Sequence, residues 1–225
     1  MDEKDELWAM IDAQREVTAT LLDQLTEKEW SRPSLCAGWT VRDVAAHLTL
    51  QQVGFGELVG SLIRHPGVLG GMNHMINGIA RIKAAAEPTG SLIREIRGMI
   101  GSRRHNVGVT AEETLIDIAV HGQDIAVPLD RELDLPPATA ARAASRAWSY
   151  GARGKAAVFA RIPVSGYRLV ATDTEWERGD GPEIRGPIAA LLLLITGRRA
   201  GLTRLVGPGA DRLRAATGGP SRLAN

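Results

Sequence analysis

Apolar residues recur at helical spacing through the first two thirds of the chain. Between residues 3 and 25 they return every three to four positions with charged residues between them, which predicts one long amphipathic helix. Further helices are predicted from Thr40 to a stop at Pro66, over 67–87 despite its glycines, over 90–101, from Thr110 to a stop before Pro128, and from Pro136 to about Tyr150. Several helices joined by short links predict an antiparallel bundle.

Two of these helix starts carry a hydroxyl residue followed three positions later by an acid. The segments are Thr40-Val41-Arg42-Asp43 and Thr110-Ala111-Glu112-Glu113. In such a capping box each of the two side chains bonds the backbone N–H of the other residue. Both segments therefore mark the beginning of a helix.

The pattern changes after about residue 155. Val158–Ile162 and Tyr167–Ala171 alternate with a period near two across the turn at Pro163–Gly166, which predicts a hairpin, and Glu183–Arg185 is a candidate third strand. The apolar run Pro187–Thr196, closed by Gly197, predicts a buried helix. We therefore expect an α+β protein with a helical bundle over residues 1–152, a small α+β module over 153–217 and a tail over 218–225.

Composition narrows the class of protein. The chain has 225 residues, of which 44% are hydrophobic and 24% charged, as in ordinary globular domains. Its 27 basic and 26 acidic residues give a net charge of +1, which argues against a nucleic-acid partner. One cysteine, Cys36, excludes an internal disulfide. The acidic start and the short apolar run Ile188–Ile195 predict a cytoplasmic protein without a membrane partner.

Three side chains on two predicted helices form a candidate metal site. Asp117 and His121 lie four residues apart on one helix and therefore share a face, and His47 lies about two turns into an earlier helix. Two imidazoles and one carboxylate suit a divalent metal and leave positions open for water or substrate. The alternative is that each histidine is a core residue whose nitrogens are satisfied by hydrogen bonds.

Other residues compete for these roles. Glu113 lies one turn before Asp117, but its place in the capping box argues against metal binding. His74 is a spare ligand on the glycine-rich helix. Cys36 is a candidate nucleophile, although no histidine lies near it in sequence, and a small apolar thiol under Trp39 is the simpler interpretation.

Three stretches carry a more specific pattern. They are Trp30-x-x-Pro33-x-x-x-x-Gly38-Trp39-Thr40-Val41-Arg42-Asp43-Val44-x-x-His47-Leu48, then His121-Gly122-Gln123-Asp124, then Arg168 to Asp173 with Gly179 to Pro187 and Thr196-Gly197-Arg198. With them the sequence resembles the mycothiol-dependent maleylpyruvate isomerase family, which belongs to the DinB-like metal-binding four-helix bundles. The resemblance extends over most of the chain.

The resemblance implies a ligand set and a second set of functional residues. It implies a divalent metal, usually zinc with nickel as another candidate, held by His47, Asp117 and His121, where the family isomerase has Glu at the position of Asp117. It also implies a sterol-carrier-like carboxy-terminal module that lends an arginine to the active site. Arg198 is the first candidate and Arg185 the second, and a surface ion pair is the alternative for either.

The resemblance further implies the chemistry. Mycothiol, the small thiol of actinobacteria, would be activated as a thiolate on the metal, add to a conjugated double bond of a small anionic electrophile, and leave after rotation about the resulting single bond. Arginine would hold the substrate carboxylates. A mycothiol S-transferase acting on electrophilic metabolites or xenobiotics is one alternative, a non-catalytic ligand- or partner-binding bundle is another, and a homodimer is left open.

Overall fold

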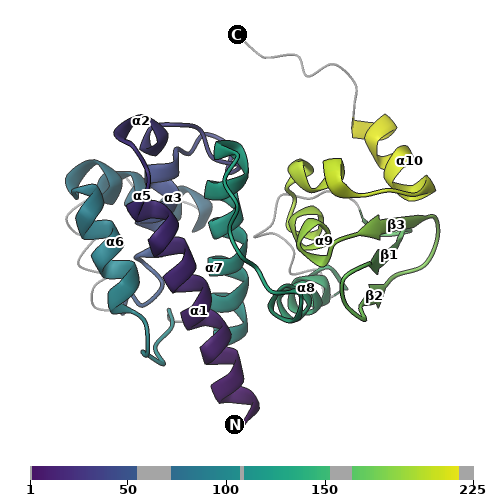
Figure 1. The fold of residues 1–225 in the computed structure, drawn as a ribbon, viewed down its shortest axis with the longest axis horizontal. Helices are drawn as coiled ribbons and strands as arrows, with labels where there is room; N and C mark the ends of the chain where they lie inside the picture. Colours follow the sequence, from purple (N-terminus) through teal and green to yellow (C-terminus); the bar gives the residue numbers. More distant parts are fainter. Residues whose placement is uncertain (1, 55–71, 107–108, 153–163, 218–225) are drawn as a thin grey trace. The chain divides into compact units, whose positions relative to one another are not determined.

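The computed structural model describes residues 2–54, 72–106, 109–152 and 164–217. They form two compact units, Met1–Asp134 and Leu135–Asn225 (Figure 1). The first unit is helical and the second combines helices with a small three-stranded sheet, which confirms the α+β class expected from the sequence.

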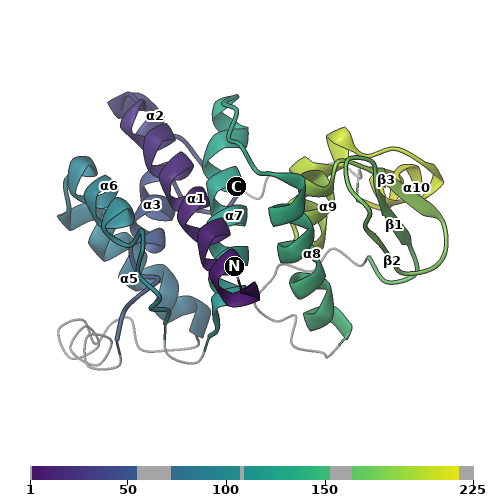
Figure 2. The ribbon, with the colours of Figure 1, turned by 60° about the horizontal axis from the view of Figure 1, so that its bottom comes forward.

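One helix of the first unit contacts both halves of the bundle. The elements are α1 (Glu3–Asp23), α2 (Glu27–Trp30), α3 (Val41–Leu48), α5 (Met72–Ala86), α6 (Thr89–Gly98), α7 (Ala111–Ala126) and the 3₁₀ helix η2 (Val127–Leu129). Helix α1 packs against α6 and α7, and α3 packs against α5 and α7 (Figures 1 and 2). Fully buried side chains such as Leu22 of α1 and Ile118 of α7 fill the core, and burial of each stabilises the fold by about 1.5–3 kcal/mol. Helix α7 therefore contacts α1, which pairs with α6, and also α3, which pairs with α5.

The predicted capping boxes are confirmed. The Asp43 carboxylate accepts hydrogen bonds from the backbone N–H and the hydroxyl of Thr40, at 2.8 and 2.7 Å. The Glu113 carboxylate accepts from the backbone N–H of Thr110 at 2.7 Å, and from its hydroxyl. These bonds begin α3 and α7, the helices that carry the three candidate metal ligands.

Helix α3 is much shorter than predicted. It ends at Leu48 and not at Pro66. The hydroxyl of Thr49 donates to the carbonyl of Ala46 at 2.7 Å, a local bond that competes with the helix, and the chain then turns through residues 49–52. Apolar spacing continues beyond Leu48, so periodicity alone did not mark this end. Pro66 lies outside the described residues.

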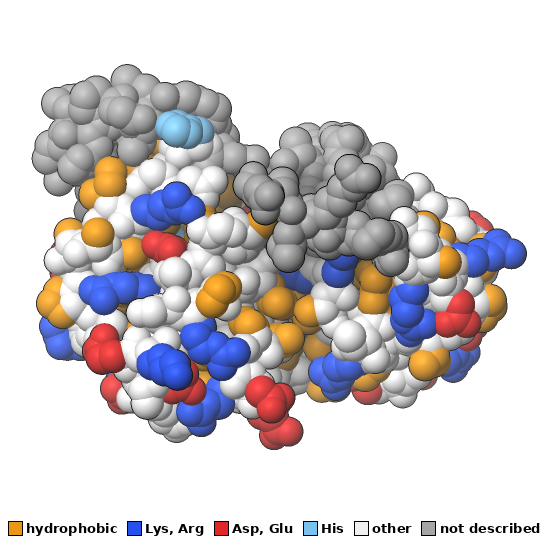
Figure 3. Space-filling model, turned by 90° about the horizontal axis from the view of Figure 1, so that it is seen from above, with side chains coloured by type: hydrophobic (Ala, Val, Ile, Leu, Met, Phe, Trp, Pro, Cys, Tyr) orange, Lys and Arg blue, Asp and Glu red, His pale blue; other side chains and the backbone are white. Residues whose placement is uncertain are grey.

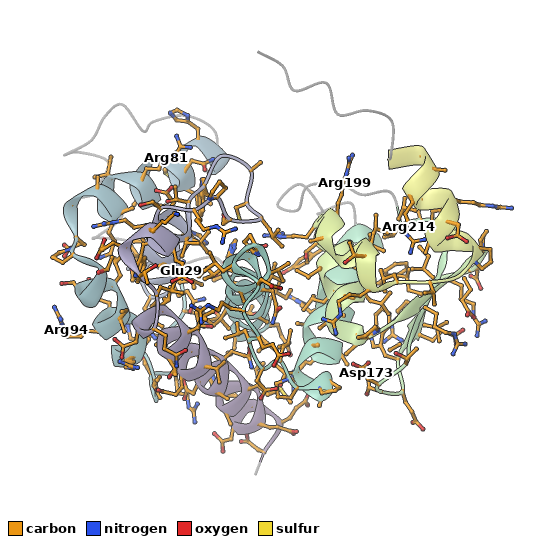
Figure 4. All side chains as sticks on the ribbon, turned by 45° about the horizontal axis from the view of Figure 1, so that its top comes forward. Glu29, Arg81, Arg94, Asp173, Arg199 and Arg214 are labelled. Atoms are coloured by element: carbon orange, nitrogen blue, oxygen red, sulfur yellow. The ribbon has the colours of Figure 1, made fainter. Side chains whose placement is uncertain are left out.

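The second unit is organised around an apolar helix. Its elements are α8 (Pro137–Ala152), β1 (Arg168–Ala171), β2 (Glu177–Arg178), β3 (Glu183–Gly186), α9 (Ile188–Ile195), the 3₁₀ helix η4 (Arg199–Arg204) and α10 (Pro208–Thr217). Helix α9 packs against α8, η4 and both β1 and β3. The side chain of Asp173 (Figure 4) accepts from the backbone N–H of Ile188 at 2.9 Å and so begins α9. The buried helix predicted over Pro187–Thr196 is thereby confirmed.

The sheet has the order β2-β1-β3. Strand β1 pairs antiparallel with β2 and parallel with β3, with Leu169 opposite Ile184. The strands expected near residues 167–171 and 183–185 are present, whereas α10 and the two-residue β2 were not predicted. The predicted strand Val158–Ile162 lies outside the described residues.

The two compact units divide at a different place from the predicted domains. The sequence put the boundary after residue 152, whereas the units divide between Asp134 and Leu135, so α8 belongs to the second unit. Its buried face consists of small residues, among them Ala140 and Ala144, and α8 packs closely on α9. Helical periodicity identifies such a helix but not the partner on which it packs.

Charges of both signs are interspersed on the face drawn in Figure 3, in keeping with the net charge of +1. Among the described helices, none combines the length and the apolar character needed to cross a bilayer. The long α1 carries charged residues throughout, and the apolar α9 has only eight residues.

Candidate metal centre

Two neighbouring helices bring the three predicted ligands together. His47 lies in the last turn of α3, and Asp117 and His121 lie one turn apart on α7, which packs against α3. The Oδ1 atom of Asp117 is 3.2 Å from Nε2 of His47 and 3.4 Å from Nε2 of His121. All three possible ligand atoms lie within 4.8 Å of one another.

These separations fit a single small cation. Two donors bound to one tetrahedral ion at about 2.0–2.1 Å lie roughly 3.3 Å apart, close to both distances from Asp117. The side chains are also accessible, because His47, Asp117 and His121 are 17%, 29% and 15% exposed. All three side chains are therefore partly exposed to solvent. Asp117 makes these contacts although its side chain is one methylene shorter than glutamate.

The charge of Asp117 is stabilised by its neighbours. Burial raises the pKa of this carboxyl, but the imidazoles of His47 and His121 and the amide of Gln51 lower it by more, so the pKa lies well below its usual range. The carboxylate is therefore ionised at neutral pH, which is the form that binds a metal.

A second carboxylate orients His121. The Oδ2 atom of Asp124 lies 2.8 Å from Nδ1 of His121, and the Asp124 side chain is fully buried. A carboxylate oxygen at this distance suits an imidazole that carries its proton on Nδ1, and in that tautomer the lone pair of Nε2 is directed toward Asp117. His47 differs, because its Nδ1 is buried without a hydrogen-bond partner among the described residues.

The thiol of Cys36 is a second neighbour of the Asp124 carboxylate. Its Sγ donates to Oδ2 of Asp124 at 3.1 Å and lies 3.6 Å from Nδ1 of His121. The sequence showed no histidine near Cys36, because the two are distant in the chain and meet only through the fold. Asp124 could have been found, since it follows His121 by three residues and therefore shares its helix face.

An aromatic ring covers both imidazoles. Trp39 is almost fully buried, and its ring lies 5.4 Å from that of His47 in an edge arrangement and 6.4 Å from that of His121 in a stacked one. Its indole N–H donates to the side chain of Asn77. The turn before α3 thus supplies an apolar wall beside the candidate ligands, a role that the sequence did not suggest for Trp39.

The remaining candidates each have a different local environment. Glu113 is engaged in the capping box of α7, and His74 is exposed on α5. In the second unit, Arg185 forms an exposed ion pair with Glu183 at 2.7 Å, and Arg198 donates to the carbonyl of Thr196 at 2.6 Å. The catalytic role of the two arginines stays a prediction.

The first unit defines the chain as a helical-bundle protein with a candidate divalent-metal site, followed by an α+β unit. Comparison with known proteins identifies a matching domain family. Residues 11–88 match the family model described as the mycothiol maleylpyruvate isomerase N-terminal domain. This segment belongs to that domain family, which confirms the resemblance drawn from the sequence.

Solved structures agree with this assignment at the level of the fold. The mycothiol-dependent maleylpyruvate isomerase is 12% identical to this chain with a TM-score of 0.62, and the match covers 93% of this chain and 94% of that one. A histidine-to-alanine mutant of the same isomerase gives 11% identity, the same TM-score of 0.62 and the same coverage. A search among curated proteins finds no match.

Proposed function

We propose that this chain is a mycothiol-dependent enzyme of the maleylpyruvate isomerase type that uses a divalent metal held by His47, Asp117 and His121. The observation that carries the proposal is the convergence of two imidazole nitrogens and one ionised carboxylate within 4.8 Å. The family assignment of residues 11–88 and the fold shared with a mycothiol-dependent isomerase support it.

When bound, a divalent ion favours the thiolate form of a coordinated thiol at neutral pH. The residues of the chain would prepare the site for this chemistry. Asp117 supplies a charged oxygen, His121 presents Nε2 because Asp124 holds its other nitrogen, and Trp39 shields one side of the imidazoles from water. Asp124 and Trp39 would thus keep the ligands oriented while the thiol and the electrophile bind.

We assign the orientation of an anionic substrate to Arg198 first and Arg185 second. A guanidinium binds a carboxylate best through two parallel N–H groups. Arg185 already uses two of its nitrogens on Glu183, at 2.7 and 3.5 Å. To bind a substrate carboxylate, Arg185 would have to give up this contact.

Metal content tests the ligand set. Wild-type protein purified without chelator is expected to contain one equivalent of zinc or nickel by elemental analysis and to bind mycothiol in a calorimetric titration. Asp117→Ala and His47→Ala are expected to lose both, because a site with two of its three protein ligands holds a divalent ion weakly. His74→Ala is the matched control, since it removes an exposed histidine of the same unit. Metal-free wild-type protein that gains no thermal stability with zinc would contradict the proposal.

Product analysis separates the two enzymatic alternatives. An isomerase returns free mycothiol after each turnover, whereas a transferase leaves a stable thioether adduct that mass spectrometry detects. Incubation with mycothiol and maleylpyruvate or a related unsaturated diacid is expected to consume no thiol. The cytoplasmic location and the homodimer stay predictions.

A further inference from the structure

A fully buried arginine lies behind the candidate metal site. The side chain of Arg15 on α1 is 0% exposed, and its guanidinium donates to the backbone carbonyl of Met99 at 2.8 Å. It also donates through Nε and Nη2 to the same oxygen, Oε1 of Gln51, at 3.4 Å each, and pairs with Asp12 at 3.3 Å. A buried guanidinium requires such partners, because an uncompensated charge in the interior is costly.

Gln51 connects this arginine to a candidate ligand. Its Nε2 donates to Oδ2 of Asp117 at 2.7 Å. The other oxygen of the same carboxylate, Oδ1, is the atom that faces His47 and His121. The two oxygens of Asp117 therefore have separate partners, the amide on one side and the imidazoles on the other.

The arginine also settles which end of the amide faces Asp117. An isolated glutamine side chain can present either its carbonyl oxygen or its amino group. Because Arg15 is a donor only, it binds Oε1, and the amino group is left to point at the carboxylate. Gln51 is itself almost fully buried, so water does not readily replace either bond.

We propose that Gln51, oriented by the buried Arg15, is a positioning residue that holds Asp117 with Oδ1 directed at the metal position. The inference rests on the proposed function and deepens it. It names two side chains that orient the metal ligand Asp117 without contacting the metal ion themselves. Removal of such a partner lowers metal affinity by about 10–100-fold in known metal sites.

Cobalt titration of two adjacent glutamine variants tests this role. Gln51→Met removes both hydrogen bonds and keeps the length of the side chain, and it is expected to bind Co²⁺ at least about 10-fold more weakly than wild type, with displaced visible absorption bands. Gln52→Met is the matched control, because Gln52 pairs with Ser102 and is expected to match wild type in affinity and spectrum.

A second variant covers the case in which Gln51→Met unfolds because Arg15 has lost an acceptor. Gln51→Glu keeps an acceptor for Arg15 but has no N–H for Asp117, so the protein is expected to fold and its Co²⁺ spectrum to differ from wild type. A spectrum identical to that of wild type in this folded variant would contradict the positioning role.

The outcomes separate this inference from the proposed function. Wild-type affinity and spectrum in the Gln51 variants, with metal lost in Asp117→Ala, would overturn the positioning role alone. Absence of cobalt binding in wild-type protein would overturn both. Weaker binding in Gln52→Met equal to that in Gln51→Met would also overturn the positioning role, because the effect would then come from the segment as a whole.

Discussion

At the scale of single residues, the candidate site depends on a buried carboxylate outside the three donors. The Oδ2 atom of Asp124 lies 2.8 Å from Nδ1 of His121 and accepts from the thiol of Cys36 at 3.1 Å. A hydrogen bond from Nδ1 to an ionised group settles the tautomer of an imidazole and increases the basicity of its other nitrogen. His121 is therefore oriented for binding by its neighbour as well as by its place on α7.

We predict that Asp124→Ala weakens divalent-metal binding by about 10–100-fold, since His121 would lose the partner that holds its proton on Nδ1. Competition titration with a chromophoric chelator measures the affinity. Asp23→Ala serves as the control, because Asp23 is an exposed carboxylate of the same unit that pairs with Arg97. Equal affinities for Asp124→Ala and wild type would show that helix packing alone orients His121.

At the scale of secondary-structure elements, hydrogen bonds of the capping residues set where the short helices begin. The capping box of α2 pairs Thr26 with Glu29, and Glu29, which Figure 4 labels, also binds Arg131 at 2.8 Å. The backbone N–H of Thr26 makes the largest contribution to lowering the pKa of Glu29, followed by Arg131, and the pKa falls to about 2. This side chain links α2 to the segment that follows α7.

The lowered pKa of Glu29 gives a pH-dependent stability. Because the folded pKa is below the unfolded value of about 4.3, the ionised group stabilises the fold above that value, and the contribution is lost as pH falls toward about 2. We predict that Glu29→Gln lowers the denaturation midpoint at neutral pH, and that the difference from wild type shrinks progressively between these two pH values. Urea titrations across the range measure it, and a difference independent of pH would contradict this origin.

At the scale of the whole molecule, the described groups that build the candidate metal centre all lie in the first unit. The end of this unit is tied to its helices, because Gln14 donates to the carbonyl of Asp134 at 3.2 Å and Gln123 to that of Leu133 at 3.1 Å. Helix α7 also approaches this segment closely, since a Cβ on Gly122 would lie 2.7 Å from the side chain of Leu133.

We therefore predict that a fragment of residues 1–134 folds cooperatively and binds a divalent ion as tightly as the full chain. It is expected to lack mycothiol-dependent turnover, because it does not contain Arg198 and Arg185, to which we assign the orientation of the substrate. Circular dichroism during urea unfolding and cobalt titration check the first part, and an activity assay checks the second. An unfolded fragment would mean that the second unit is needed for the stability of the first.

The sequence by itself determined the features that depend on neighbours in the chain. Capping boxes at Thr40 and Thr110 and the four-residue spacing of Asp117 and His121 act within one or two helical turns, so they can be found without a fold. For the same reason, most helices and two of the strands of the sheet were predicted close to their observed bounds.

Only the tertiary structure decided which distant side chains meet. Arg15 lies on α1 and Gln51 in the turn that follows α3, and Cys36 reaches His121 across 85 positions of sequence. The packing of α8 on α9 likewise depends on contacts that periodicity does not encode. Such partners are chosen by shape, burial and the need to satisfy polar groups in the interior, and these conditions exist only once the chain has folded.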